Sequence, residues 1–229
     1  MTSPVPKQPA PGRAPRALVL FHGAGSDRDY ETLQAVARSA AERNIETERV
    51  NFPYRQKGPG RRPPDRMPKL MAAVHEAVTG LADRLGCQKS EVVIGGHSMG
   101  GRAASMVAAD GFGTTAASVD ETSIDEPRVS GVVAGNQPAG LVLLSYPLHP
   151  QGNPEALRVD HFDRIHCPVL LIQGNKDRLG TPEEFALHLP TIPGHLDQIW
   201  LDGGHDLRRH DDDIARHVGR WLGSLGASD

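Results

Sequence analysis

The sequence predicts an α/β fold in which a parallel sheet of about six strands is covered by helices on both faces. Short apolar runs alternate along the chain with longer stretches whose apolar residues recur at helical spacing. Residues 17–21 and 140–145 are apolar almost throughout, which is typical of parallel strands buried on both sides. A length of 229 residues suits one domain of this kind.

Each strand is a short run bounded by turn residues, at residues 17–21, 45–51, 92–94, 140–145, 168–174 and 198–202. We expect the spatial order 2-1-3-4-5-6, with the third strand central. The second strand is the more polar one, which favours an edge position, and the sixth strand is expected at the opposite edge. The result is a minimal sheet without additional antiparallel strands.

Capping residues mark the ends of several helices. Asp27 or Asp29 is expected to cap the helix that follows the first strand, and Gly86 to end a long amphipathic helix. Thr181 and Glu184 have the spacing of a capping box at the start of a further helix.

Two stretches depart from this alternation. Residues 1–16 are rich in proline and offer almost nothing to bury, so we expect a disordered tail before a single domain over residues 17–229. Residues 110–139 are rich in Thr, Ser, Gly and acidic residues, and only residues 129–134 could form a short element there. A helix-to-strand connection lies opposite the carboxyl ends of parallel strands, so this segment is not expected to form a lid.

Composition excludes several classes of function. The net charge of −3 gives no overall attraction to nucleic acid or to an anionic membrane, and no run resembles a signal peptide or a membrane span. Cys87 and Cys167 form neither a metal-binding pattern nor a disulfide framework and are interpreted as packing residues. We expect a cytoplasmic protein with no metal or cofactor and no nucleic-acid or membrane partner.

The pentapeptide Gly96-His97-Ser98-Met99-Gly100 lies between a buried strand and a run of small helix-forming residues. It has the G-x-S-x-G spacing of a nucleophile elbow. A serine on such a sharp strand-to-helix turn needs a strained backbone, so the residues two positions away must be nearly free of side chains. The spacing predicts Ser98 as a nucleophile and His97 as a packing or supporting residue.

Ser98, Asp177 and His205 occur in this order, each just beyond the expected carboxyl end of a strand. A serine hydroxyl needs a base to remove its proton, and the base works best when a carboxylate holds its tautomer. Parallel sheets gather such residues at one edge. Asp177 could instead be an ordinary turn residue, and Asp202 and Asp206 are too near His205 in sequence to orient it easily. The order therefore predicts a catalytic triad.

An oxyanion hole requires two N–H donors. We expect one from the backbone of Met99, directly after the nucleophile, and the other from Gly23 or Ala24 in the loop after the first strand. A phosphate-binding role for that glycine-rich loop is the alternative, but no Walker lysine follows it.

Substrate contacts are expected from loops on the same edge of the sheet, at Tyr54, Arg55, Pro147, Leu148 and His149. Arg55 opens a basic, proline-rich loop and could attract a substrate anion, although a solvated charge on a mobile loop is the simpler interpretation. Residues 146–166 are too short and too rich in proline to form a large helical cap. We therefore expect an open cleft that favours short acyl groups.

Several segments resemble those of α/β-hydrolases, namely LVLFHGAG, FPYR, GGHSMGGRAAS, LLSYPLHPQG, QGNKDRLG and GGHD. More narrowly, the chain resembles the hydrolase-like family that includes testis-expressed protein thirty and the third subunit of the NSL chromatin complex. It is more loosely similar to dienelactone hydrolases, which use a cysteine where this chain has Ser98. The resemblance spans nearly the whole chain from residue 17 and implies a minimal α/β-hydrolase fold.

The function expected from these residues is hydrolysis of an ester, thioester or related acyl bond of a small molecule through an acyl-Ser98 intermediate. In this hypothesis His205 acts as base and then as acid, and Asp177 orients it. The alternative is an interaction module that keeps the fold but has no activity; the complete set of Ser98, His205 and Asp177 argues against it.

Overall fold

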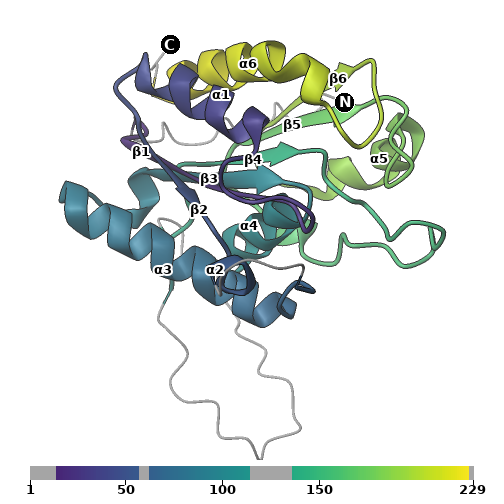
Figure 1. The fold of residues 1–229 in the computed structure, drawn as a ribbon, viewed down its shortest axis with the longest axis horizontal. Coiled ribbons are helices and arrows are strands. Elements are labelled where there is room, and N and C mark those ends of the chain that lie inside the picture. The colour runs from purple at the N-terminus through teal and green to yellow at the C-terminus, as the bar shows by residue number, and fades with distance from the viewer. Residues whose placement is uncertain (1–13, 57–61, 114–135, 227–229) are drawn as a thin grey trace, which may run out of the picture.

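A computed structural model of the chain describes residues 14–56, 62–113 and 136–226. Its centre is a six-stranded parallel sheet in the order β2-β1-β3-β4-β5-β6 (Figure 1). The strands are β1 (Ala17–Phe21), β2 (Glu46–Val50), β3 (Val92–His97), β4 (Gly140–Leu144), β5 (Val169–Gly174) and β6 (Leu196–Leu201). The predicted fold class and strand order are confirmed, and the polar β2 lies at an edge of the sheet.

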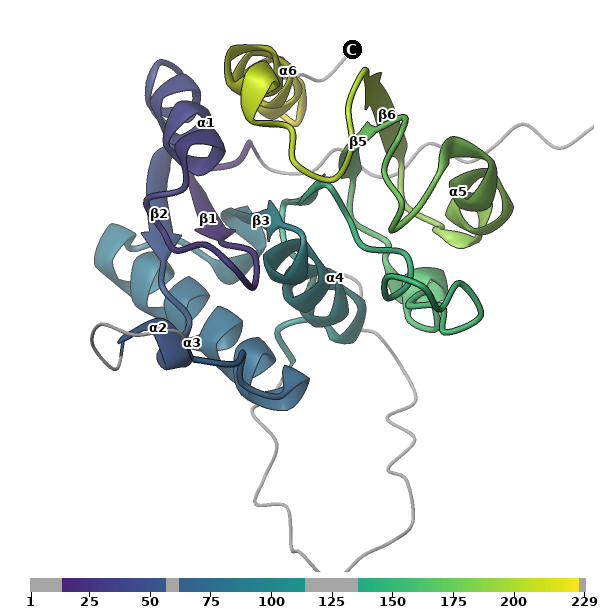
Figure 2. The ribbon, with the colours of Figure 1, turned by 45° about the vertical axis from the view of Figure 1, so that its right-hand side comes forward.

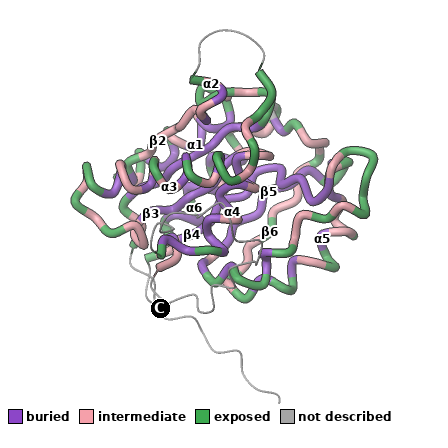
Figure 3. The backbone as a smooth tube through the Cα atoms, turned by 90° about the horizontal axis from the view of Figure 1, so that it is seen from below, coloured by how far each residue is buried: buried purple, intermediate pink, exposed green. Residues whose placement is uncertain are grey.

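The helices form a layer on each side of the sheet. Figure 1 shows α1 (Glu31–Ala41) and α6 (Asp211–Ser224) on one side, and α3 (Met67–Leu85) and α4 (Met99–Asp110) on the other. The short α5 (Pro182–His188) contributes Phe185 to the core on the α3 and α4 side. Successive residues of a strand point to opposite faces, so Leu18 and Leu20 pack under α1 and α6 while Val19 and Phe21 pack under α3 and α4. Strands β1, β4 and β5 are consequently buried along their whole length, and β3 is buried except at His97 (Figure 3).

Helix ends follow the predicted chemistry in two cases and depart from it in one. Gly86 ends α3 in the left-handed conformation (φ 58°), and Thr181 and Glu184 form the capping box of α5. The expectation that Asp27 or Asp29 caps α1 is wrong, because α1 begins after Tyr30 without a side-chain cap. Asp27 instead accepts the N–H of Asp29 (2.9 Å) within the preceding turn.

Several short helical elements connect the main ones. The turn after β2 contains the unexpected four-residue helix α2 (Pro53–Gln56). The 3-10 turns are Lys89–Glu91, Phe162–Arg164, Leu189–Thr191 and Arg208–His210. Between residues 146 and 166 the only helical element is the turn Phe162–Arg164, so no helical cap is built from this segment.

Some sequence-based expectations fall outside the described residues. These are the structure of residues 1–13, of residues 129–134 and of residues 57–61 in the basic loop that Arg55 opens.

Candidate active site

Ser98 lies on the sharp turn between β3 and α4, with backbone angles of φ 52° and ψ −113°. Left-handed φ values are rarely adopted by residues with a side chain, and they store strain. The turn is possible only because its neighbours lack Cβ atoms: a Cβ at either Gly96 or Gly100 would collide with the carbonyl oxygen of Phe21. The Ser98 N–H donates to Leu144 O (2.8 Å), which fixes the elbow against the end of β4.

A chain of hydrogen bonds links Ser98 to His205 and His205 to Asp177. The Oγ of Ser98 lies 2.8 Å from Nε2 of His205, and Nδ1 of His205 lies 2.8 Å from Oδ2 of Asp177. A carboxylate only accepts, so Nδ1 carries the proton and Nε2 is left free to accept the serine hydroxyl. The structure thus brings together the three residues that the sequence placed at different strand ends.

Asp177 is completely buried, and three donors surround its carboxylate. Besides His205, the side-chain amide of Gln173 donates to Oδ2 (2.6 Å) and the N–H of Leu179 donates to Oδ1 (2.8 Å). A buried carboxylate needs such hydrogen bonds to offset the loss of its hydration. The donors therefore hold the charge and the orientation of the side chain that contacts His205.

Backbone hydrogen bonds tie together the two loops that carry the acid and the histidine. The N–H of Asn175 donates to Leu201 O and the N–H of Lys176 donates to Gly203 O, both at 2.9 Å. These bonds extend the β5–β6 pairing past the strand ends. The Asp177–His205 contact is thereby built on the sheet rather than on two independent loops.

The expected oxyanion loop borders the nucleophile. A Cβ added to Gly23 would lie 3.5 Å from Ser98 Cβ and 2.8 Å from His97 Nδ1, so only a glycine leaves this approach open. The Tyr54 hydroxyl donates to Ala24 O (3.1 Å). The His22 ring donates to Gly23 O (2.7 Å) within the loop and accepts the N–H of Phe52 (3.2 Å), which links the loop to the segment after β2. Met99 opens α4, where the first N–H groups of a helix have no intrahelical partner.

The residues expected to contact substrate are mostly buried. Leu148 is fully buried and His149 is 4% exposed, with its Nδ1 2.9 Å from Pro150 O and its Nε2 3.3 Å from Glu184. Pro147 is also buried. Packing and these polar contacts hold both side chains in place, and their contact with a substrate stays a prediction.

Tyr54 and Arg55 form a unit next to the oxyanion loop. Tyr54 is 3% exposed, and the Arg55 guanidinium lies 5.6 Å from the centroid of its ring. Burial raises the pKa of the Tyr54 hydroxyl, while hydrogen bonding to Arg55 acts in the opposite direction. Tyr54 thus supports the loop from behind rather than contacting a ligand directly.

One supporting residue, Gln173, escaped the sequence-based prediction of the site. Gln173 lies inside an otherwise apolar strand, and a lone amide in such a run signals that something polar is buried beside it. His97, which was expected as a packing or supporting residue, packs between the rings of Tyr30 (4.8 Å between centroids) and His205 (5.6 Å) and is tilted relative to both. Burial, and then the nearby His205, lower the pKa of His97 to about 4, so its ring adds no charge beside His205 near neutral pH.

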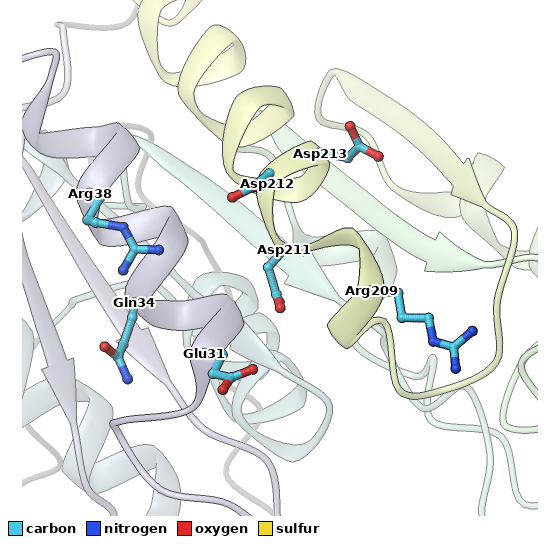
Figure 4. Close-up of a pocket in the computed structure, with 7 residues that line it drawn as sticks. All are labelled: Glu31, Gln34, Arg38, Arg209, Asp211, Asp212 and Asp213. Atoms are coloured by element: carbon cyan, nitrogen blue, oxygen red, sulfur yellow. The ribbon is translucent and has the colours of Figure 1, made fainter.

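A polar groove lies away from these residues, at the N-terminal ends of α1 and α6 (Figure 4). It has a volume of 610 Å³ and is lined by charged and amide side chains, Glu31, Gln34, Arg38, Arg209, Asp211, Asp212 and Asp213. The Thr32 hydroxyl donates to Asp211, and burial raises the pKa of that carboxyl. The groove offers no apolar wall for an acyl chain and includes none of the three linked residues.

The described residues offer neither a metal site nor a membrane-spanning helix. His, Cys, Asp and Glu side chains nowhere gather there in a group of three that could hold a metal ion. Within the same ranges, no helix is long and apolar enough to cross a bilayer.

The sheet order and the serine elbow define the class as an α/β-hydrolase fold. A family profile described as an alpha/beta hydrolase domain matches residues 14–219. The chain belongs to this family of α/β-hydrolase domains. None of the curated proteins compared with it matches its sequence.

Solved structures with the same fold are similar over almost the whole chain. A putative hydrolase of the α/β superfamily from Xanthomonas campestris is 20% identical, with a TM-score of 0.60, over 91% of this chain and 98% of its own. Est1E from Butyrivibrio proteoclasticus with ferulic acid bound is 16% identical, with a TM-score of 0.69, and the match covers 95% of this chain and 92% of Est1E. A monoacylglycerol lipase from Paleococcus ferrophilus is 15% identical, with a TM-score of 0.64, and the match covers 93% of this chain and 96% of the lipase. At these identities the likeness shows the fold.

Proposed function

We propose that this protein is a serine hydrolase that cleaves an ester, thioester or related acyl bond through an acyl-Ser98 intermediate. The observation that carries the proposal is the pair of 2.8 Å contacts from Ser98 Oγ to His205 Nε2 and from His205 Nδ1 to Asp177 Oδ2. The family profile, described as an alpha/beta hydrolase domain, and a monoacylglycerol lipase among the solved structures with the same fold support a hydrolase in general terms.

In the first half of the reaction, Ser98 Oγ attacks the carbonyl carbon of the substrate while Nε2 of His205 takes the hydroxyl proton. The resulting imidazolium is stabilised by the Asp177 carboxylate. Collapse of the tetrahedral intermediate expels the leaving group, which receives the proton from His205. The acyl group remains on Ser98.

The negative charge of the tetrahedral intermediate needs donors that are already in place. The N–H of Met99 at the start of α4 and an N–H of Gly23 or Ala24 are proposed for this role. Support comes from the approach of Gly23 to Ser98 and from the contacts that Tyr54 and His22 make with the Gly23–Ala24 carbonyls. The positive end of the α4 dipole adds to the same field.

In the second half, water replaces the leaving group. His205 Nε2 removes a proton from the water, which attacks the acyl carbon and regenerates Ser98. No residue other than these is required to transfer a proton, since the same histidine serves as base and acid in both halves.

Three finer predictions belong with this proposal. Within the superfamily, the motifs quoted above favour the hydrolase-like domains of the testis-expressed protein thirty type. The absence of a helical cap over residues 146–166 supports a preference for short acyl groups. The two free thiols, Cys87 and Cys167, agree with the expected cytoplasmic location.

Labelling by a fluorophosphonate probe tests the proposal, since the probe reacts with an activated serine. We expect the native protein to be labelled and Ser98→Ala to be unlabelled. Ser90→Ala is a matched control, because Ser90 lies at the opposite, amino-terminal end of β3 and should not affect labelling. Absence of labelling in folded native protein, or equal labelling of Ser98→Ala, contradicts the proposal.

A further inference from the structure

Two arginines near the elbow have no carboxylate partner. Arg102 lies in the second turn of α4, and Arg158 lies in the segment between β4 and β5. Their neighbour Arg164 pairs with Asp110 and Asp163, whereas neither Arg102 nor Arg158 forms an ion pair with any described residue. The Nε of Arg102 is buried without a hydrogen-bond partner in the described part of the chain. Buried donors of this kind normally have a partner.

Arg102 is directed toward the nucleophile by the geometry of α4. It follows Ser98 by four residues, and its N–H donates to Ser98 O (3.0 Å). Residues four apart share a face of the helix, about 6 Å apart along the axis. Helical side chains lean toward the N-terminus, so the long Arg102 side chain extends back toward the Ser98 end of α4.

Arg158 reaches the same region from the other wall. Its Nη1 lies 3.5 Å from Pro147 O, three residues after Leu144, whose carbonyl accepts the N–H of Ser98. Its backbone is held by two contacts: its N–H donates to Leu148 O (2.9 Å) and its carbonyl accepts the Tyr146 hydroxyl (2.6 Å). The Arg158 side chain thus contacts the segment that continues β4 past the point where Leu144 O accepts the Ser98 N–H.

The segment between β4 and β5, which carries Arg158, packs against α4, which carries Arg102. The 3-10 turn Phe162–Arg164 packs against α4, which Figure 2 shows next to the end of β3, and His161 Nε2 lies 2.8 Å from Ser105 Oγ on that helix. Burial lowers the pKa of Arg158, and the positive charge of Arg102 lowers it further. Both side chains nevertheless keep part of their surface exposed. Two like charges held close together favour a bound anion between them.

We propose that Arg102 and Arg158 form an anion-binding subsite beside Ser98 that takes the free carboxylate of a short dicarboxylic acid esterified at its other end. Guanidinium groups bind carboxylates through paired N–H donors in a planar fork. The separation of about one helical turn between Ser98 and Arg102 suits a short chain between the two carboxyl groups. This assignment of substrate class rests on the proposed acyl-Ser98 chemistry.

The kinetic test compares two esters with acyl chains of equal length, the mono-p-nitrophenyl ester of glutaric acid and p-nitrophenyl valerate. The measured quantity is the ratio of kcat/KM for the anionic ester to that for the neutral one. We expect Arg158→Gln and Arg102→Gln each to lower this ratio about tenfold or more, because hydrogen bonds between charged groups are lost. Arg158→Lys, which keeps the charge but not the fork, should lower it less.

Arg216→Gln is the matched control, since Arg216 lies on α6 across the sheet and pairs with Asp213. It should leave the ratio unchanged. A ratio that stays constant in the Arg102 and Arg158 variants while both esters are hydrolysed overturns the subsite and leaves the proposed function standing.

Calorimetric titration of Ser98→Ala with glutarate tests the subsite without any turnover. Glutarate should bind to Ser98→Ala and should bind at least about tenfold more weakly when Arg158→Gln is added. Binding that depends on Arg158 in a protein that hydrolyses neither ester supports the subsite and contradicts the proposed function. No binding of glutarate, or binding that does not depend on either arginine, overturns the subsite.

Discussion

Replacing Asp177 with asparagine tests how the acid controls the histidine. Oδ1 of Asp177 accepts the N–H of Leu179, while Oδ2 accepts from both Gln173 and His205. The Leu179 donor belongs to the backbone and cannot reverse, so the asparagine oxygen has to face it. The new NH2 group then faces His205 and Gln173. The Gln173 amide can turn over to accept from it.

The histidine then adopts the wrong tautomer. To accept from the amide, His205 Nδ1 must lose its proton, and Nε2, which faces Ser98, must gain one. A protonated Nε2 cannot take the serine proton. The corresponding replacement in a serine protease lowers kcat about 10⁴-fold, equivalent to about 5.5 kcal/mol. We expect Asp177→Asn to lower kcat about 10³- to 10⁴-fold with little change in fold.

The assay is steady-state hydrolysis of p-nitrophenyl acetate, with circular dichroism and thermal melting to verify folding. Asp202→Asn is the matched control, because Asp202 is exposed, pairs with Lys176 and lies three residues before His205. It should change kcat less than about twofold, since exposed ion pairs contribute little. If folded Asp177→Asn keeps more than about a tenth of the native kcat, the tautomer argument fails.

Three further outcomes follow from single contacts. Tyr54→Phe removes the hydrogen-bond donor to Ala24 O and should lower kcat about fivefold with little change in KM. Unchanged kinetics would show that the Tyr54 hydroxyl does not hold the loop. Gly100→Ala places a Cβ against Phe21 O and should destabilise the fold by about 1–3 kcal/mol in urea unfolding; an unchanged midpoint refutes the close approach. Burial lowers the pKa of His161 to about 4 from 6.5, so protonation of the unfolded chain should reduce stability by up to about 3 kcal/mol as the pH falls from 6.5 to 4. His161→Gln should flatten that part of the stability curve, and an identical slope in both proteins would contradict the buried neutral ring.

The strands and their order could be predicted from the sequence because burial on both faces leaves a simple signal. β1, β4 and β5 are uninterrupted apolar runs, and the structure places their bounds within a residue of the expected ones. The predicted bounds of β6 were less accurate, because the strand begins at Leu196 rather than at residue 198. Its side chains are only partly buried and its composition is mixed, so the apolar signal is weaker. Residues 45–51 could be predicted as an edge strand because they are more polar than the other strands.

The three linked residues were predictable because each occupies a strand end, and parallel topology gathers strand ends at one edge. Most of the contacts that support these three residues could not be predicted, because they join residues far apart in sequence. Tyr54 reaches the Gly23–Ala24 loop across about thirty positions, and nothing local in the sequence indicates that its hydroxyl faces two carbonyl oxygens. The contact between His149 and Glu184 was equally out of reach, since it depends on how α5 packs.

The acyl-Ser98 intermediate can be observed directly by mass spectrometry of protein mixed rapidly with p-nitrophenyl acetate and quenched with acid. We expect a pre-steady-state burst of p-nitrophenol whose amplitude is proportional to the enzyme concentration. We also expect an acetyl group on the peptide that contains Ser98. His205→Ala should abolish both, because the serine then has no base. Turnover that occurs without acetylation of Ser98, or with the acetyl group on another residue, would contradict the account.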